Sequence, residues 1–413
     1  MIGSRSCTIA IAGAGPVGLS VAAMLASGPL GGHIELRILE PREPPNWDPG
    51  HLDLRVYALS RASQRILENL GLWESIVSAR ACPYRRMHVW EGELDGQVGH
   101  LTFDSADIGE PDLGHIVEDG LLRDRLLARL AALPNIELSF GVSVAALHAT
   151  ARAVEIRIST GEKLKANLLV AADGSASAVR SLLRAPVTDF SYGQHAVVTH
   201  VVTEKPHAET AWQRFLPGGP LAFLPLADGR SSVVWSIPSE HAEALVEEPE
   251  ESFLRELQVA SGGVLGAFES AAGCASFPLR AAHVRRYGYP RVALVGDAAH
   301  TVHPLAGQGM NLGLLDAAAL AEVLEQAVTE GQDAGDLRVL RRYERRRKGE
   351  NLKMLLALDG LHRVFRLTGP VLPRLRALGM SAVDATPLAK RFLMREALAL
   401  GGDLPSTARA RIA

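Results

Sequence analysis

The stretch Thr8-Ile-Ala-Ile-Ala-Gly-Ala-Gly-Pro-Val-Gly-Leu-Ser20 decides the fold of this chain. Its apolar run, residues 8–12, predicts a short buried strand, and the Ala/Leu-rich segment that continues to Ala26 predicts a helix. Glycines stand at 13, 15 and 18 between them. In such a turn the first glycine allows the tight bend, the second lets the backbone approach a pyrophosphate, and the third lets the helix pack closely on the strand.

The second strand of this unit is predicted over residues 34–39, which alternate in hydropathy. It ends at Glu40, 40 − 18 = 22 residues past Gly18. An acidic side chain at the end of that strand is placed to bind ribose hydroxyls. The strand, the helix and the acid together predict a βαβ unit that binds a dinucleotide and opens a doubly wound parallel sheet.

The rest of the chain predicts further elements around this unit. Helices are expected over 58–70 and 121–133, and strands over 154–158, 168–172 and 292–295. Residues 190–280 alternate in hydropathy between prolines and glycines, which is typical of an antiparallel sheet. From residue 337 onward the sequence is helical in pattern. We therefore predict an α/β fold: a doubly wound, Rossmann-like domain with an inserted, mainly antiparallel β-sheet domain and a helical C-terminal region.

The predicted boundaries divide the chain into six segments. The nucleotide-binding domain takes residues 1–75, 101–185 and 285–345. The substrate domain takes 76–100 and 186–284, and the C-terminal helical region takes 346–413.

Two further motifs combine a strand end with polar residues. Asp173 and Gly174 follow the apolar run 169–172, and a turn without a ligand is an equal alternative there. Asp297 follows the strand at 292–295, at the carboxyl end where open α/β sheets bind ligands. A glycine-rich loop and a helix come next, and the positive end of that helix would point at the ligand. The histidines in this motif, His300 and His303, are interpreted as core residues.

The composition sets limits on function. The 413 residues carry a net charge of −3, which does not favour nucleic-acid binding. The three cysteines, Cys7, Cys82 and Cys274, form no zinc spacing, so no metal site is predicted and a reducing, cytoplasmic compartment is expected. Residues 341–413 contain 16 Lys+Arg and 6 Asp+Glu, a local charge of +10. This basic region, with apolar residues at near-helical spacing from Leu355 to Phe365, suggests contact with the inner face of a membrane or with an acidic partner. A solvated helix face is an equal alternative.

In the order of its three motifs, the chain resembles the group A flavoprotein monooxygenases, which have the p-hydroxybenzoate-hydroxylase fold. The segment His303-Pro-Leu-Ala-Gly-Gln-Gly-Met-Asn-Leu-Gly-Leu-Leu-Asp316 resembles the signature of the aromatic-ring hydroxylases of ubiquinone biosynthesis. The similarity extends over nearly the whole chain and includes residues 55–73, 191–194 and 219–226.

The resemblance implies FAD as the cofactor and NAD(P)H as the electron donor. It also implies which residues contact FAD: Gly13, Gly15, Gly18, Glu40, Arg55, Arg123, Asp173, Gly174, Asp297, Gly307, Gly309, Met310 and Asn311. Pro304, Gly307 and Gln308 would lie near the isoalloxazine ring. We expect Gly309 to permit close backbone approach and any positive φ.

The activity that the resemblance implies is hydroxylation of the aromatic ring of a polyprenylated phenol by O2, through a flavin C4a-hydroperoxide. The apolar segment 212–235 would contact the substrate. No catalytic base is identified; His195 and His200, on a predicted strand of the insert, are candidates, and surface or core roles are the alternative. A related flavoenzyme, such as a halogenase or prenyl reductase, and a flavin-binding scaffold without turnover in a biosynthetic complex are the alternatives.

Overall fold

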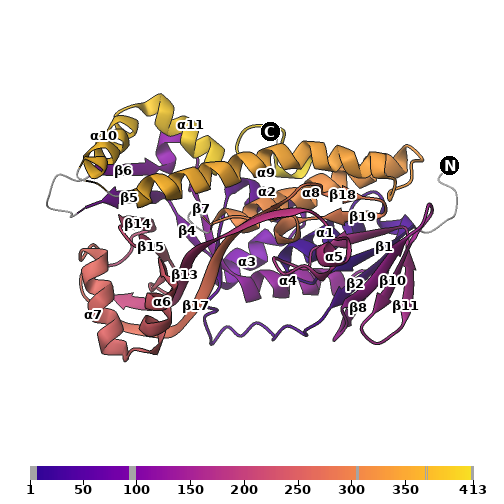
Figure 1. Ribbon diagram of the computed structural model, residues 1–413, viewed down its shortest axis with the longest axis horizontal. Coiled ribbons are helices and arrows are strands. Elements are labelled where there is room, and N and C mark those ends of the chain that lie inside the picture. The colour runs from indigo at the N-terminus through magenta and orange to yellow at the C-terminus, as the bar shows by residue number, and fades with distance from the viewer. Residues whose placement is uncertain (1–6, 93–98, 304–306, 368, 370, 411–413) are drawn as a thin grey trace.

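A six-stranded sheet, here called the central sheet, lies in the right-hand part of the computed structural model (Figure 1), which describes residues 7–92, 99–303, 307–367, 369 and 371–410. Its strand order is β18-β19-β12-β1-β2-β8. All neighbours are parallel except β18 and β19. These strands are β1 (Cys7–Ala12), β2 (Ile34–Glu40), β8 (Ile136–Phe140), β12 (Leu168–Ala171), β18 (Gly288–Tyr289) and β19 (Val292–Leu294). The predicted doubly wound parallel sheet is confirmed.

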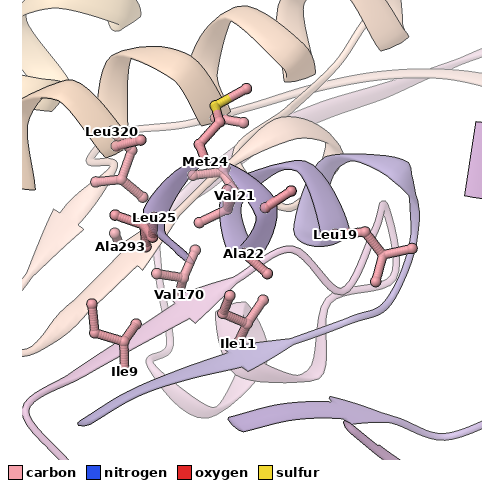
Figure 2. Close-up of a cluster of buried hydrophobic side chains, with 14 of the residues drawn as sticks. Ile9, Ile11, Leu19, Val21, Ala22, Met24, Leu25, Val170, Ala293 and Leu320 are labelled. Atoms are coloured by element: carbon pink, nitrogen blue, oxygen red, sulfur yellow. The ribbon is translucent and has the colours of Figure 1, made fainter. Parts of the chain in front are cut away.

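Helix α1 (Pro16–Ser27) packs against this sheet, and Figure 2 shows the contact. Leu19, Val21 and Leu25 of α1 are fully buried with Ile9 and Ile11 of β1. Apolar residues of β12, β19 and α8 (Gln308–Thr329) complete the cluster. Burial of such side chains contributes roughly 1.5–3 kcal/mol each, so this core fixes α1 and the turn before it.

Helices and two small sheets surround the central sheet. The helices are α2 (Arg61–Asn69), α3 (Trp73–Arg80), α4 (Asp119–Ala131) and α5 (Ala178–Leu182). One sheet joins β3 (Val56–Leu59), β7 (Gly114–Glu118) and β4 (Cys82–Tyr84), and the other joins β9 (Val144–Ala149), β10 (Val154–Ile158) and β11 (Lys163–Ala166).

The helix expected over 58–70 therefore begins too early. Residues 56–59 pair with β7 instead, and the Oγ of Ser60 accepts a hydrogen bond from the N–H of Ser63, which caps α2.

The predicted insert is an eight-stranded, mainly antiparallel sheet in the order β20-β17-β13-β16-β15-β14-β5-β6, in which only β14 and β5 are parallel. Its strands are β5 (Arg86–Glu91), β6 (Gly99–Asp104), β13 (Val187–Thr203), β14 (Thr210–Leu216), β15 (Gly219–Pro225), β16 (Ser231–Pro238), β17 (Phe268–Val284) and β20 (His300–Thr301). Helices α6 (Ser239–Glu247) and α7 (Glu250–Ser261) lie at one end of it (Figure 1). The domain boundaries stay predictions, and β6 crosses the one placed after residue 100.

The C-terminal region is helical, as predicted, with α9 (Leu337–Arg366), α10 (Leu372–Asp384) and α11 (Pro387–Ala397). The basic cluster at 341–348 is not one continuous surface. The guanidinium of Arg347 is buried, and that of Arg346 forms ion pairs with Glu322 at 2.7 Å and Asp403 at 3.1 Å. Arg347 pairs with Asp316, which like Glu322 belongs to α8, so these two arginines hold α8 and α9 together. No helix in the described residues is long and apolar enough to cross a bilayer.

Candidate active site

A cavity of about 480 Å³ opens where the two large sheets meet. The nucleotide-binding part of the chain lines one side of it with Gly15–Val17, Ala172, Gly174, Asp297 and residues 307–310. Strands β14, β15 and β16 line the other side, and α11 adds Leu393, Met394, Ala397 and Leu398.

The three glycines of the first motif have three different environments. Gly13 has φ +102°, and a Cβ there would lie 2.4 Å from the carbonyl oxygen of Ala172. A Cβ on Gly18 would lie 2.1 Å from the carbonyl oxygen of Gly13, so α1 could not pack where it does. A Cβ on Gly15 would meet no atom within 4 Å, and Gly15 lines the cavity. Two glycines are thus required by the chain itself, and the third leaves open space.

Two helices begin at this cavity without a cap. Neither Gly15, before α1, nor Gly307, before α8, supplies a side-chain hydrogen bond, and neither helix has an acidic residue in its first turn. By contrast, Ser60 caps α2 and Asp336 caps α9. Uncapped N-terminal N–H groups and the helix dipole favour a negatively charged ligand. The cavity therefore has two separate positions for anionic groups.

Glu40 lies behind the glycine-rich turn. Its Oε2 accepts a hydrogen bond from the N–H of Ala14 at 2.7 Å, and its Oε1 accepts one from Arg42 at 3.2 Å. Glu40 is not among the lining residues, but its bond to Ala14 holds the carboxylate next to Gly15. Each oxygen keeps capacity for a further donor.

Asp297 lines the cavity at the carboxyl end of β19. Burial raises the pKa of its carboxyl, and the charges of His300, Arg55 and Arg180 oppose that shift. A Cβ on Gly309 would lie 4.0 Å from Oδ1 of Asp297, at ordinary contact distance and without a positive φ. The residue of this loop with positive φ is Gly307, at +61°, so that part of the expectation for Gly309 is wrong.

Arg55 and Arg123 lie at the cavity together with two residues that the sequence did not indicate, Tyr57 and Asp119. The carboxylate of Asp119 accepts hydrogen bonds from Nη2 of Arg123 at 2.7 Å and from the hydroxyl of Tyr57 at 2.6 Å. Nε of Arg123 is buried and has no hydrogen-bond partner in the described part of the chain. The guanidinium of Arg55 lies 5.4 Å from the centre of the Tyr57 ring.

Of the adjacent residues Asp173 and Gly174, only Gly174 lines the cavity. Both carboxylate oxygens of Asp173 are used within the fold, accepting from the hydroxyl of Ser177 and from the N–H of Val179 at 3.0 Å. This places the carboxylate at the start of α5, and Asp173 does not line the cavity. Gly174 does, with φ +79° and open space around it.

Asn311 fixes the start of α8 and does not line the cavity. Its Oδ1 accepts from the N–H of Ser60 at 2.8 Å and from the hydroxyl of Ser63 at 2.7 Å, and its Nδ2 donates to the carbonyl of Ala58 at 2.9 Å. Gly307, Gln308, Gly309 and Met310 line the cavity. Pro304 lies outside the described residues.

The histidines differ in their placement. His300 and His303 are buried, which confirms their interpretation as core residues. Neither His195 nor His200 lines the cavity. Nε2 of His200 instead lies 3.0 Å from the carbonyl oxygen of Asp53, and burial lowers its pKa. The sequence therefore indicated no catalytic base that the structure brings to the cavity.

The sheet side of the cavity is mostly apolar. Phe103, Ala222, Leu224 and Val234 lie there with two polar residues from the same sheet, Gln213 and Ser236. The predicted substrate segment 212–235 supplies only its alternate residues to this wall; Trp212 and Phe223 belong to the core on the other face. The period of two in β14 and β16 was the signal that could have separated the two faces.

The profile of a family described as "FAD binding domain" matches residues 6–354. The chain belongs to this family. The 3-demethoxyubiquinol 3-hydroxylase of Escherichia coli (strain K12) is 35% identical, over 95% of this chain and 98% of that protein. The ubiquinone hydroxylase UbiL of Rhodospirillum rubrum is 36% identical, over 97% and 92%.

Among solved structures, the p-nitrophenol 4-monooxygenase PnpA of Pseudomonas putida DLL-E4 has a TM-score of 0.78. At 19% identity over 96% of this chain and 98% of that one, it shows the fold. The protein is an FAD-dependent monooxygenase, as the resemblance implied. The relatives named here are hydroxylases and give no support to the halogenase, prenyl-reductase or scaffold alternatives.

The cavity of this FAD-binding family member fits its cofactor. FAD carries a diphosphate, and Gly15 provides open space for it at an uncapped helix start. The second uncapped start, at α8, suits the negative charge of a reduced flavin ring. The Nε of Arg123, which has no hydrogen-bond partner in the described part of the chain, is a further donor at the cavity.

Asp316 of α8 joins the loop of Asp297 to α9. Its Oδ2 accepts from the N–H of Gly296 at 3.2 Å and lies 2.6 Å from Nε2 of His300. Its Oδ1 accepts from Nε of Arg347 at 2.8 Å and Nδ2 of Asn351 at 2.9 Å. The buried carboxylate is thus fully hydrogen-bonded and holds the loop in place.

Proposed function

We propose that this monooxygenase hydroxylates the aromatic ring of a polyprenylated phenol in ubiquinone biosynthesis. The observation that carries the proposal is the construction of one cavity from two contrasting walls. One wall holds two uncapped helix starts, and the other is a mostly apolar sheet face closed by α11. The names of the two ubiquinone hydroxylases support the substrate class.

For the cofactor, we propose that the turn at Gly13, Gly15 and Gly18 receives the FAD diphosphate and that Glu40 binds the adenosine ribose. Asp297 would bind the ribityl chain, and Gly307–Met310 the pyrimidine end of the flavin. Arg55 and Arg123 would lie along the same molecule. When bound, FAD supplies the activation of O2 that a protein side chain cannot provide. NAD(P)H is the proposed electron donor.

The residues of this chain bind, orient and exclude water. The apolar side chains of the sheet wall and α11 keep the ring in a dry site, and Gln213 and Ser236 offer hydrogen bonds to its oxygen substituents. Tyr57 and Asp119 hold Arg123 in position. Burial raises the pKa of the Tyr57 hydroxyl well above its usual value, so it stays protonated and donates to Asp119.

Glu40→Ala tests the ribose assignment. The change should weaken FAD binding by the loss of one or two charge-assisted hydrogen bonds, each on the order of 1.5–3 kcal/mol. Titration of the apoprotein with FAD, followed by quenching of flavin fluorescence, measures the affinity. Glu43→Ala, at an exposed acid three residues along the chain, is the matched control and should bind like the wild type. Equal affinity of both variants would remove Glu40 from the ribose.

The substrate class is tested by comparing phenols with and without a prenyl tail. Because the cavity wall is apolar, the tailed phenol should give the hydroxylated product, while a water-soluble hydroxybenzoate should be a poor substrate. Product is measured by mass spectrometry beside NAD(P)H consumption, which separates hydroxylation from unproductive oxidation. Efficient turnover of the tail-less hydroxybenzoate would contradict the proposal.

A tailed phenol is held in a bilayer, so we also propose peripheral contact of this protein with the inner face of a membrane, or with proteins of a biosynthetic complex.

A further inference from the structure

Helices α10 and α11 leave large apolar side chains in solvent. Of the 16 large apolar residues that are exposed in the described chain, 11 lie between residues 352 and 393. Six of them form what we call the C-terminal apolar face: Val371 at the N-cap of α10, Leu375 and Leu378 of α10, and Leu388, Phe392 and Leu393 of α11. Met380 and Met394, on the opposite sides of the same helices, are buried. Each helix thus has an apolar inner side and an apolar outer side.

The spacing on each helix makes the outer side continuous. Leu375 and Leu378 are three residues apart, and Leu388 and Phe392 are four apart, so each pair lies on one face of its helix. The two helices pack against each other at one end of the molecule (Figure 1). Contiguous exposed apolar area of this kind marks an interaction surface.

This face is continuous with the cavity. Leu393 is 42% exposed and also lines the cavity, next to Met394, Ala397 and Leu398 of the same helix. Phe392, its neighbour, is 61% exposed. One helix, α11, therefore has residues in the cavity wall and residues on the outer apolar surface, with Leu393 between them.

The charges beside this face are basic and lack acidic partners. Arg374, Arg391 and Arg395 are exposed, and within the described residues none of them has a carboxylate within 4 Å. The other basic residues of α10 and α11 are paired: Arg376 with Glu91, and Lys390 with Asp107. Residues 352–400 contain 8 Lys+Arg and 3 Asp+Glu, a net charge of +5.

We propose that the C-terminal apolar face docks on an anionic lipid bilayer, and that the apolar tail of the substrate passes from the lipid to the cavity beside Leu393. The inference rests on the proposed function for the nature of that tail. Helices with Leu and Phe on one side and Arg beside them lie in the membrane interface, and anionic lipid attracts the unpaired arginines. The docking surface is α10 and α11, and not the basic cluster of α9 to which the sequence pointed.

Vesicle co-sedimentation of the FAD-loaded, full-length protein tests the surface. The probes are vesicles of phosphatidylcholine alone and of phosphatidylcholine mixed with phosphatidylglycerol. The wild type should bind the mixed vesicles more tightly than vesicles of phosphatidylcholine alone, and high salt should reduce this difference. The double variant Leu388→Ser, Phe392→Ser should bind at least tenfold more weakly, because two apolar side chains no longer enter the lipid. Val259→Ser, on α7, is the matched control because Val259 and Leu388 are each 79% exposed.

The charge is tested separately. Arg391→Gln and Arg395→Gln should each reduce binding to the mixed vesicles by roughly fivefold and leave binding to phosphatidylcholine unchanged. Arg157→Gln, at an exposed and unpaired position of β10 in the described chain, should bind like the wild type. Failure of the wild type to bind either vesicle, or wild-type binding by all the α11 variants, would overturn the proposal and leave a protein partner for this face.

Hydroxylation in detergent micelles separates this inference from the proposed function. With the tailed phenol in micelles, the Leu388→Ser, Phe392→Ser variant should keep wild-type turnover; with the phenol in mixed vesicles, its turnover should fall in parallel with binding. Absence of product in micelles from the wild type would contradict the proposed function, whatever the vesicle binding. Wild-type turnover by this variant in vesicles would contradict only the delivery of the tail through this face.

Discussion

Replacing Gly15 with aspartate should leave the apoprotein folded and abolish its binding of FAD. Gly15 has φ −72° and open space at its Cβ position, so the side chain fits without strain. Aspartate is a favoured residue before a helix, and its charge suits the helix dipole, so the apoprotein should be as stable as the wild type or more stable by up to ~1 kcal/mol. The same carboxylate would occupy and repel the diphosphate of FAD. We expect a loss of affinity on the order of a thousandfold, or ~4 kcal/mol.

The matched change three residues along the chain, Gly18→Ala, should instead destabilise the apoprotein. Its Cβ would lie 2.1 Å from the carbonyl oxygen of Gly13, so α1 must move away from β1 and the apoprotein should lose about 1–3 kcal/mol. Thermal unfolding of both apoproteins and FAD titration provide the two measurements. Wild-type FAD affinity of the aspartate variant would exclude this turn as the diphosphate site.

Replacing Asp316 with alanine should cost about 3–5 kcal/mol of unfolding free energy, because it leaves the guanidinium of Arg347 buried without its carboxylate. It also removes the hydrogen-bond acceptor of the Gly296 N–H, which holds the loop of Asp297 in place. FAD affinity should therefore fall as well. Chemical denaturation measures the first effect and flavin titration the second.

Asp403→Ala is the control, since Asp403 pairs with the adjacent Arg346 but is largely exposed; such pairs contribute ~1 kcal/mol or less. If the two variants were equally stable, the buried network would not hold the loop.

Acid should weaken the wild type through the same carboxylate. Burial alone would raise the pKa of Asp316, but the charges of His300 and Arg347 and the hydrogen bonds outweigh it and lower the pKa to about 2. A carboxyl with a lowered pKa stabilises the fold above its ordinary value near 4 and loses that contribution as the pH falls toward 2. The Asp316→Ala variant should therefore lose less stability than the wild type over this interval.

Local patterns were sufficient for the central sheet. Residues 8–12 and 168–172 are short apolar runs, and residues 34–39 alternate in hydropathy; each is followed by glycine or an acid, and they form β1, β12 and β2 within a residue or two. The glycine spacing also predicted correctly where the turn would be tight. The segment 58–70 was harder, because Val56–Leu59 becomes a strand only by pairing with β7, about 60 residues further along.

Much of the cavity could not be predicted, because its residues come together from distant segments. Tyr57 and Asp119 are bonded across 62 residues, and nothing in either local sequence indicates the other. The role of α11 in the cavity wall has the same origin. The polar anchors Gln213 and Ser236 stand in strands whose overall composition is apolar, and only the register of the sheet assigns them to the cavity side. The sequence could not separate the buried members of the basic cluster on α9 from the exposed ones, because burial of Arg347 depends on Asp316 of another helix.

The dependence of the cavity on α11 has a consequence for biosynthesis. The residues that line the cavity range from 15 to 398. Asn311 joins the start of α8 to Ser60, across 251 residues. Contacts so distant in sequence form slowly and only after both partners have been synthesised. While the ribosome is still adding the last helices, the glycine-rich turn exists without the wall that closes over it. We therefore expect a nascent protein that stalls before α11 to expose an open apolar cavity to chaperones and proteases.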